Sequence, residues 1–344
     1  MDTSRRVVVV GLGGTIAMTA AGGAGATPAL TAGQLLDSVP WLAGTGIRLE
    51  AIDLRHLPGA AVSFDDVAAA AEVIRERLAA GASGAVMVQG TDTIEETSYL
   101  LDLTHTGREP IVVTGAMRNP SLAGADGPAN LLGAVRTAAS PATRGQGVLV
   151  VMGDEIHAAR RVRKTHTSSP ATFRSPNGGP LGYVVEGEPR LLSRLTHRTV
   201  VPVPPAAPAP RVGLFTVTLG EDGELLAGLA DRLDGAVIAG FGAGHVPERA
   251  VPALHDLAAR IPVVLASRTG AGSTLATTYG FAGSERDLLG RGLVAAGFLD
   301  PYKARILLRT LLAAGGDRET VAAAFGVAGG YADQARWPWP RAAA

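Results

Sequence analysis

Short apolar runs alternate along the chain with longer segments whose apolar residues recur every three or four positions. The short runs end at glycine or polar residues and are typical of buried strands, whereas the longer segments are typical of helices with one buried face. This alternation predicts an α/β fold in which helices cover a mostly parallel sheet. The strands are expected at residues 7–11, 84–88, 111–114, 148–152, 212–216, 235–239 and 263–266.

Several of the expected helices carry start signals. Ser63 is followed three residues later by Asp66, which is typical of a capped helix start, and a helix is expected after it. Thr93 and Glu96 have the same spacing, so we assign Glu96 to a capping box and not to catalysis. Further helices are expected at residues 127–139, from Asp300 to about Gly315, and from Asp317.

A proline-dense segment divides the chain. Residues 201–210 read Val-Pro-Val-Pro-Pro-Ala-Ala-Pro-Ala-Pro, which can form neither a central strand nor a helix. We therefore expect two α/β domains, a larger N-terminal one at residues 1–200 and a smaller C-terminal one at residues 211–344, joined by this linker.

Glycine and threonine follow two of the expected strands. Gly14-Thr15 comes after the first strand, and Gly90-Thr91-Asp92 comes after the second. Ligands bind at the carboxyl ends of parallel strands, where glycine allows a tight turn and threonine presents a hydroxyl. Each motif alone fits an ordinary turn. Two of them at neighbouring strand ends would form a site.

The glycines at 11, 13 and 14 also suggest a dinucleotide-binding turn. That fingerprint needs a small residue where this chain has Ile16, and a helix should begin at once. Residues 18–31 are instead rich in alanine, glycine and threonine and include Pro28. We expect this segment to be a mobile loop that acts as a lid.

The N-terminus has two interpretations. Arg5-Arg6, the apolar stretch behind it and an Ala/Gly-rich end at Ala26 resemble a secretory signal. We favour a buried first strand, because cleavage after Ala26 would remove the Gly14-Thr15 motif. No segment has the roughly 18–20 apolar residues needed to cross a bilayer. The chain is therefore expected to be soluble and cytoplasmic.

The composition narrows the classes of function. Basic and acidic residues number 31 each, which argues against a nucleic-acid binder or a polybasic membrane protein. The absence of cysteine excludes a disulfide framework, a thiolate nucleophile and cysteine-ligated zinc. Of the basic residues, 29 are arginine and only Lys164 and Lys303 are lysine. Arginine does not release its proton in proteins, so only a lysine could supply an amine that takes up and releases a proton. We therefore consider a specific role for each of the two lysines.

Lys164 is a candidate base for a threonine nucleophile, since threonine reacts only when a base removes its proton. It lies in the basic run 160–164, for which a solvated basic patch is the alternative interpretation. If Lys164 lay beside Thr91 and Asp92, a Thr–Lys–Asp relay could activate a hydroxyl for attack on an amide.

Several segments combine into a wider pattern that runs in order from residue 7 to about residue 330. They are Gly13-Gly14-Thr15-Ile16-Ala17, Gln89-Gly90-Thr91-Asp92-Thr93, Thr114-Gly115-Ala116-Met117-Arg118, Ser121 to Asn130, Arg163-Lys164-Thr165 and Leu299 to Arg305. Together they make the chain similar to the bacterial-type L-asparaginase family, and the resemblance covers essentially the whole sequence.

The resemblance implies hydrolysis of L-asparagine to L-aspartate and ammonia through an acyl-enzyme on threonine, without a metal or other cofactor. By position, Thr15 resembles the nucleophile, and Thr91, Asp92 and Lys164 resemble the supporting triad. Asp92 also resembles the residue that holds the substrate's α-amino group. Backbone N–H groups near Thr91 and Ala116 would stabilise the oxyanion.

The family's active sites lie between the subunits of a homotetramer. The resemblance therefore implies a homotetramer or dimer of dimers, in which Glu285 is the best match for a carboxylate supplied by the neighbour. The implied partners are L-asparagine and, as a minor substrate, L-glutamine. Neither a nucleic acid nor a membrane is expected as a partner.

The chain departs from the family pattern at several positions. Residues 14–40 hold no tyrosine, where the family's lid usually carries one that supports the nucleophile. Gln89 replaces the usual histidine, and His245 stands where asparagine is frequent. In the loop that usually binds the substrate carboxylate through serine, Arg55 or His56 would bind it by charge.

These departures keep two alternatives open. One is a glutaminase-leaning amidohydrolase, and the other is a catalytically weak amino-acid-binding member of the same fold.

Two further features have structural explanations. Asp154, Glu155 and His157 lack a recognised metal spacing, and Lys303, at the start of a C-terminal helix, is expected to have a structural role.

Overall fold

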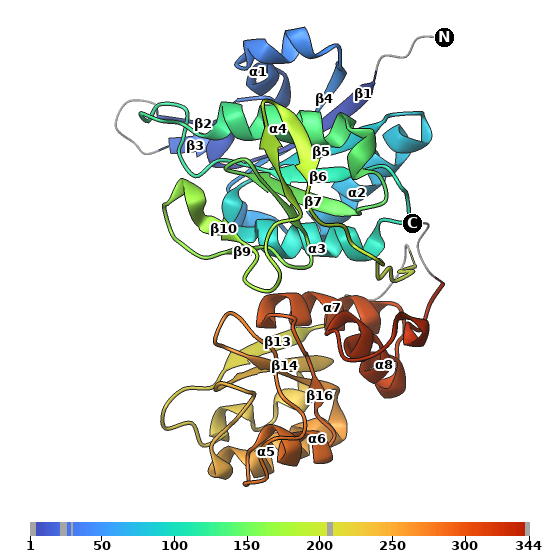
Figure 1. Cartoon of the computed structure of the whole chain (residues 1–344). Helices are drawn as coiled ribbons and strands as arrows, with labels where there is room; N and C mark the ends of the chain where they lie inside the picture. Colours follow the sequence, from blue (N-terminus) through green and yellow to red (C-terminus); the bar gives the residue numbers. More distant parts are fainter. Residues whose placement is uncertain (1–4, 21–25, 29, 205–208, 341–344) are drawn as a thin grey trace. The chain divides into compact units, whose positions relative to one another are not determined.

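The computed structural model of the chain describes residues 5–20, 26–28, 30–204 and 209–340. It divides into two units, the first ending at Arg198 and the second beginning at Thr199 (Figure 1). Both units are built from alternating strands and helices, and the α/β fold expected from the sequence is confirmed.

Unit 1 is built on an eight-stranded sheet with the order β12-β11-β8-β7-β6-β5-β1-β4. The five strands from β7 to β4 are parallel, whereas β8, β11 and β12 are antiparallel to their neighbours. The strands are β1 (Arg6–Gly13), β4 (Arg48–Leu57), β5 (Gly84–Val88), β6 (Ile111–Thr114), β7 (Val148–Met152), β8 (Glu155–Ala158), β11 (Gly182–Val185) and β12 (Glu188–Leu191).

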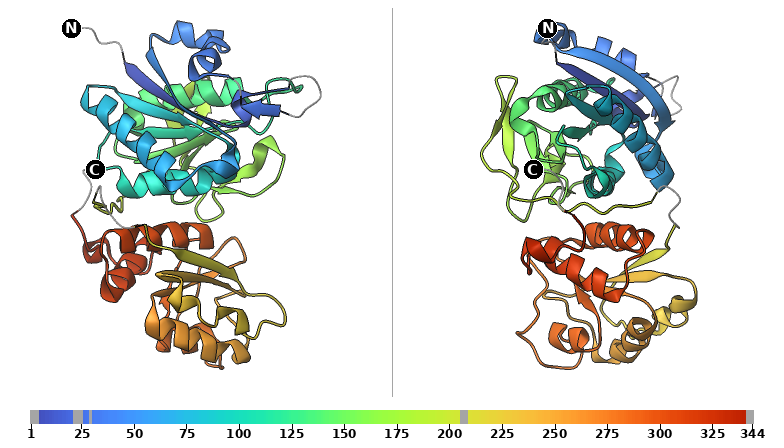
Figure 2. Two further views of the ribbon diagram at one scale, coloured as in Figure 1. Left: turned by 180° about the vertical axis from the view of Figure 1, so that it is seen from behind. Right: turned by 90° about the vertical axis from the view of Figure 1, so that its right-hand side faces the viewer.

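Helices cover both faces of this sheet (Figure 2). Alternate residues of β1 point to opposite sides, because successive side chains of a strand do so. Val7 and Val9 pack with α1 (Ala32–Asp37) and α4 (Gly127–Ala139). Val8 and Val10 pack with α2 (Phe64–Ala79) and α3 (Ile94–Thr104). The strand is therefore buried on both faces, as its unbroken valine run predicts.

The start of α2 confirms its predicted cap. Ser63 Oγ accepts from the Asp66 N–H at 3.2 Å, and Asp66 Oδ2 accepts from the Ser63 N–H at 3.0 Å. The capping box predicted for Thr93 is wrong, because its side chain makes no cap hydrogen bond. Instead, Thr93 Oγ1 donates to the Gly59 carbonyl at 3.0 Å, a contact that no local pattern encodes.

Two short hairpins extend from the sheet of unit 1. In the expected lid, β2 (Met18–Ala20) pairs antiparallel with β3 (Ala26–Pro28), so the described part of that segment is extended and paired. Residues 21–25 and 29 of the expected lid lie outside the described residues. The second hairpin pairs β9 (Arg163–Lys164) with β10 (Phe173–Arg174), and Lys164 lies opposite Phe173.

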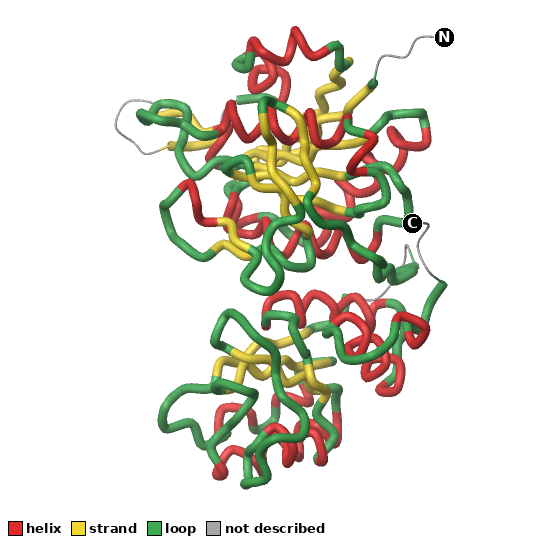
Figure 3. The backbone as a smooth tube through the Cα atoms, in the orientation of Figure 1, coloured by secondary structure: helices red, strands yellow, loops and turns green. Residues whose placement is uncertain are grey.

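Unit 2 has a four-stranded parallel sheet in the order β13-β14-β15-β16 (Figure 3). One face packs against α5 and α6, and α7 and α8 also pack on the strands. Among the described residues, no helix is both long and apolar enough to span a membrane. The elements are β13 (Val212–Thr216), β14 (Gly235–Gly240), β15 (Val263–Ser267), β16 (Val294–Ala295), α5 (Val251–Arg260), α6 (Glu285–Gly290), α7 (Pro301–Ala313) and α8 (Arg318–Ala328).

Candidate active site

The two Gly-Thr motifs meet at one edge of the unit 1 sheet. Strands β1 and β5 are parallel neighbours, with Gly11 opposite Val88. The chain leaves β1 into the 3-10 helix η1 (Thr15–Ala17) and leaves β5 into the 3-10 helix η4 (Thr91–Thr93). Parallel neighbouring strands end on the same side of a sheet, so the two turns lie together.

Three glycines let these loops approach each other backbone to backbone. A Cβ atom added at Gly14 would lie 2.1 Å from the Gly90 nitrogen, and one added at Gly90 would lie 2.4 Å from the Gly59 Cα atom. Gly14 also has a φ of 88°, in the region that favours glycine. The packing sets the Thr15 turn against the Thr91 turn, and the Thr91 turn against the segment that follows β4.

Gly14→Ala is expected to lower the free energy of unfolding by more than about 3 kcal/mol, because the new methyl group meets backbone atoms and the φ is unfavourable. Gly46 is the matched control, since its φ is 68° and no described atom lies within 4 Å of an added Cβ. Gly46→Ala should cost roughly 1–2 kcal/mol. Chemical denaturation of both variants measures the difference, and equal losses would contradict this packing.

Lys164 reaches the Thr91 turn from the β9–β10 hairpin. Its Nζ atom donates to Thr91 Oγ1 at 3.0 Å and to Asp92 Oδ1 at 2.7 Å. Thr91 is 5% exposed, whereas the side chains of Lys164 and Asp92 are 15% and 59% exposed. The amine therefore bridges a buried hydroxyl and a carboxylate open to solvent. Such a bridge can pass a proton between the hydroxyl and the amine.

The turn that contains Ala116 is held by residues of α4 and its cap. The Asp126 carboxylate accepts from the N–H groups of Met117 and Arg118, the shortest bond being 2.9 Å. Asn130 Nδ2 donates to the Gly115 carbonyl at 3.0 Å. Asp126 and Asn130 lie within the motif Ser121 to Asn130, but no local pattern in the sequence reveals that they hold this turn.

The two candidates for binding a substrate carboxylate were expected in a loop, but they lie at the end of strand β4, which reaches Leu57. Their surroundings differ. Arg55 Nε donates to Asp66 Oδ1 at 2.7 Å, so this guanidinium is directed toward the start of α2. Hydrogen bonds from Ser63 and then Arg55 hold the pKa of Asp66 below its usual range. His56 is exposed and precedes Leu57, whose carbonyl accepts from the Gly14 N–H at 2.9 Å. His56 therefore lies beside the Thr15 turn.

Glu285 lies in unit 2 with its carboxylate fully buried. Glu285 Oε1 accepts from the N–H groups of Thr278 and Tyr279 at 2.9 and 2.7 Å, and Oε2 lies 3.0 Å from His245 Nε2. Burial alone would raise the pKa of Glu285, but the hydrogen bonds from Tyr279 and His245 hold it below its usual value. The rings of Tyr279 and Phe281 flank His245, with centroids 4.8 and 5.0 Å away.

Comparison with known proteins identifies the family. Residues 6–197 match the family model "Asparaginase, N-terminal", and residues 211–325 match "Glutaminase/Asparaginase C-terminal domain". The chain belongs to the asparaginase family. The resemblance drawn from the sequence motifs is thereby confirmed.

Relatives extend over most of the chain. A probable L-asparaginase of Deinococcus radiodurans is 36% identical over 332 residues, which cover 93% of this chain and 97% of that protein. A probable periplasmic L-asparaginase of Haemophilus influenzae is 40% identical over 234 residues, covering 67% and 66%. The crystal structure of a probable cytoplasmic L-asparaginase from Campylobacter jejuni superimposes with a TM-score of 0.84 at 29% identity, covering 94% of this chain and 99% of that one.

Gln89 has a visible structural role in this asparaginase. Its buried side chain donates from Nε2 to the Gly90 carbonyl and to Thr93 Oγ1, both at 3.1 Å. Gln89 Oε1 accepts from Thr97 Oγ1 at 2.8 Å. The amide therefore ties the end of β5 to the first turns of α3 and supports the turn that carries Thr91.

Glu155 and His157 form a packing contact. His157 Nδ1 lies 2.9 Å from Ser175 Oγ, and its Nε2 lies 3.2 Å from Glu155 Oε2. Burial, together with the charge of Arg174, lowers the pKa of His157 to about 4, so the ring is neutral near pH 7. Within the described residues, no three His, Cys, Asp or Glu side chains are placed to hold a metal ion.

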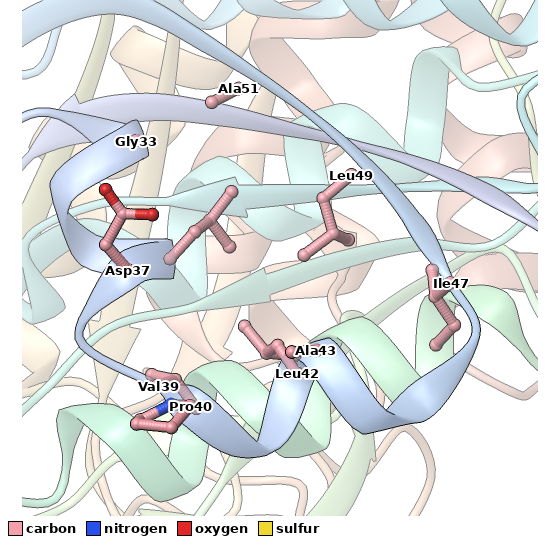
Figure 4. Close-up of a pocket in the computed structure, with 10 residues that line it drawn as sticks. Gly33, Asp37, Val39, Pro40, Leu42, Ala43, Ile47, Leu49 and Ala51 are labelled. Atoms are coloured by element: carbon pink, nitrogen blue, oxygen red, sulfur yellow. The ribbon is translucent and has the colours of Figure 1, made fainter.

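A surface hollow in unit 1 lies apart from these turns. Figure 4 shows it between α1, the 3-10 helix η2 (Pro40–Thr45) and the first half of β4. Its lining is mostly apolar, with Leu36, Leu42 and Leu49 among the larger side chains and Asp37 as the one charged residue. Thr15 and Thr91 follow the opposite, carboxyl ends of the strands, so the hollow is separate from the candidate site.

Proposed function

We propose that this asparaginase hydrolyses L-asparagine to L-aspartate and ammonia through an acyl-enzyme on Thr15. The observation that carries the proposal is the Lys164 amine, 3.0 Å from Thr91 Oγ1 and 2.7 Å from Asp92 Oδ1, at the sheet edge where the Thr15 turn packs. A threonine becomes a nucleophile only when a base removes its proton, and in this proposal Thr91 and Lys164 together take the proton of Thr15.

The reaction divides into two balanced steps. In the first step Thr15 Oγ bonds to the side-chain amide carbon of the substrate, the C–N bond breaks, and the hydroxyl proton leaves with ammonia. In the second step water adds to the ester carbon, one water proton returns to Thr15 Oγ as the bond to Thr15 breaks, and L-aspartate is released. Within each step Thr91 and Lys164 carry the proton from the attacking oxygen to the leaving group, and Asp92 keeps the amine in place.

Both steps pass through an oxyanion. Backbone N–H groups near Thr91 and Ala116 are proposed to stabilise it, a contribution of about 3 kcal/mol per donor. Such donors act only if they are fixed before the reaction. The bonds from Asp126 and Asn130 to the 115–118 turn, and those of Gln89 around the Thr91 turn, support that requirement.

We assign the substrate's α-amino group to Asp92 and its α-carboxylate to His56 or Arg55. The structure favours His56, because Arg55 is already paired with Asp66. His56→Ala should raise the KM for asparagine about tenfold and leave kcat nearly unchanged, since a hydrogen bond to the substrate carboxylate is lost.

Arg55→Ala is the matched comparison for His56→Ala. It should leave KM close to that of the wild type and lower stability by less than about 1 kcal/mol, because the Arg55–Asp66 pair is partly exposed. The KM values of the two variants, measured by steady-state kinetics, decide whether His56 or Arg55 binds the substrate α-carboxylate. A tenfold KM increase in the Arg55 variant alone would reverse it.

Substrate preference is measured by ammonia release from asparagine and glutamine. The proposal expects a higher kcat/KM for asparagine. A higher value for glutamine would favour the glutaminase-leaning alternative. Stoichiometric aspartate binding without ammonia release would favour the amino-acid-binding alternative.

We further propose a homotetramer in the cytoplasm that serves asparagine catabolism, with no metal or other cofactor. Glu285 of a second copy is the proposed contributor to the site, as the family resemblance implies. Light scattering of the purified chain measures the assembly. A monomer with full activity would remove Glu285 from the site.

A further inference from the structure

Glu95 connects the start of α3 to the hairpin that carries Lys164. Its side chain is buried, with the residue 8% exposed, although it lies in the first turn of the helix. Glu95 Oε2 accepts from the backbone N–H of Lys164 at 3.3 Å and lies 3.8 Å from Arg163 Nε. The guanidinium offsets the charge of the buried carboxylate. The hydrogen bond links residues 69 positions apart.

Glu95 lies on the same segment of the chain as the two residues that the Lys164 amine contacts. The two acceptors of the Lys164 amine, Thr91 and Asp92, lie in η4, which runs directly into α3. Glu95 is therefore held on the same continuous segment as both acceptors. A bond from this segment to the Lys164 backbone fixes the distance that the lysine side chain has to span.

Strand β9 lies outside the main sheet, so the ladder of the main sheet does not fix the position of Lys164. In the described part of the chain, β9 is two residues long and pairs with β10 alone. Strand β10 is attached to β8 by Arg174, which donates to Glu155 Oε1 at 3.1 Å. Beside that attachment, the buried side chains of Val162 and Phe173 anchor the hairpin in the core of unit 1, and Glu95 supplies the side-chain bond to the main chain of Lys164 itself.

We propose that Glu95 is a positioning residue, which sets the Lys164 amine against Thr91 and Asp92 by fixing the lysine main chain. The inference rests on the proposed role of Lys164 in asparagine hydrolysis. Lysine has a long flexible stem, so a displaced main chain changes where its amine lies. Displacements of about 1 Å at a catalytic group can cost 100-fold in rate.

The test compares variants of the full-length enzyme in asparagine hydrolysis. Glu95→Ala should lower kcat roughly 10- to 100-fold and change KM by less than about twofold, because Glu95 does not touch the substrate. Glu95→Gln keeps an oxygen acceptor for the Lys164 N–H and should restore most of the lost kcat. If Glu95→Ala does not fold, Glu95→Met removes the acceptor with a side chain of similar length, and the same results are expected.

Asp102 provides a matched control on the same helix. It is buried, and its Oδ1 accepts from the Val148 N–H at 3.0 Å, so it also ties α3 to a strand through a backbone bond. Asp102→Ala, which removes this acceptor as Glu95→Ala removes the other, should lower Tm without changing kcat. If the Glu95 variants change only Tm, as this control does, Glu95 is merely structural and the inference is wrong.

A double variant separates this inference from the proposed function. In a Lys164→Met background, Glu95→Ala should cause no further fall in kcat, because the amine that Glu95 positions is gone. A further fall of tenfold or more would overturn the inference. A Lys164→Met enzyme with the wild-type kcat would instead overturn the proposed relay itself.

Discussion

Thr15→Ala is expected to lower kcat for asparagine by at least about 1000-fold, because the variant lacks the hydroxyl that forms the acyl-enzyme. The Lys164, Thr91 and Asp92 contacts lie on other elements and should remain. Thr15→Ser keeps a hydroxyl and should retain measurable turnover. Ammonia release under saturating asparagine measures all three enzymes.

Thr45→Ala is a control for this variant. Thr45 lies in η2, where its Oγ1 donates to the Leu42 carbonyl at 2.7 Å and accepts from the Ile47 N–H at 3.2 Å. Its loss should lower the free energy of unfolding by about 1 kcal/mol and leave kcat unchanged. A Thr15→Ala enzyme that keeps more than a tenth of the wild-type kcat would remove Thr15 from the role of nucleophile.

Lys164→Arg is expected to lower kcat by at least about 100-fold, the usual minimum for general acid–base catalysis. The guanidinium keeps the positive charge beside Asp92 but does not release a proton in proteins. KM should change much less, because the charge on this edge of the site is preserved. The kcat and KM of the variant, measured at several pH values, test the proton-transfer role.

Lys303, the only other lysine of the chain, supplies the comparison. It is fully buried in α7, with Nζ 3.6 Å from Asp300 Oδ2. Lys303→Met should lower Tm and leave kcat at the wild-type level. If Lys164→Arg behaved in the same way, the amine would be serving only as a fixed charge.

Most of the parallel core of the fold could be predicted from local signals. Runs such as Gly84–Val88 and Val148–Met152 are apolar, β-branched and bounded by turn residues, and the structure places strands at these residues. The sequence also predicted that the two Gly-Thr turns are neighbours. Each turn follows a strand, and the two strands, β1 and β5, pair in parallel, so both turns lie on the same side of the sheet. The ten-residue edge strand β4 was missed, because its end resembles the family's substrate-binding loop. Eight short strands, β2, β3, β8 to β12 and β16, were also missed, since two to four residues show no period.

Side-chain partners were harder to predict than backbone elements. Thr93 has the spacing of a capping residue, but the carbonyl of Gly59, 34 positions away, accepts its hydroxyl. Arg55 has the charge to bind a carboxylate, but Asp66 already takes its Nε. Glu95 reads as an ordinary acidic residue in a first helical turn, and only the folded chain brings it to Lys164. In each case the sequence shows the chemical group and tertiary packing selects its partner.

Hydroxylamine provides a direct test for an acyl-enzyme on Thr15. Hydroxylamine is a stronger nucleophile than water, so it should intercept an ester of Thr15 and release aspartyl β-hydroxamate when the enzyme turns over asparagine. Wild-type enzyme is expected to form the hydroxamate at the expense of aspartate, while Thr15→Ala forms neither product at a comparable rate. Hydroxamate formation by Thr15→Ala at the wild-type rate, or its absence while the wild-type enzyme still hydrolyses asparagine, would contradict the account.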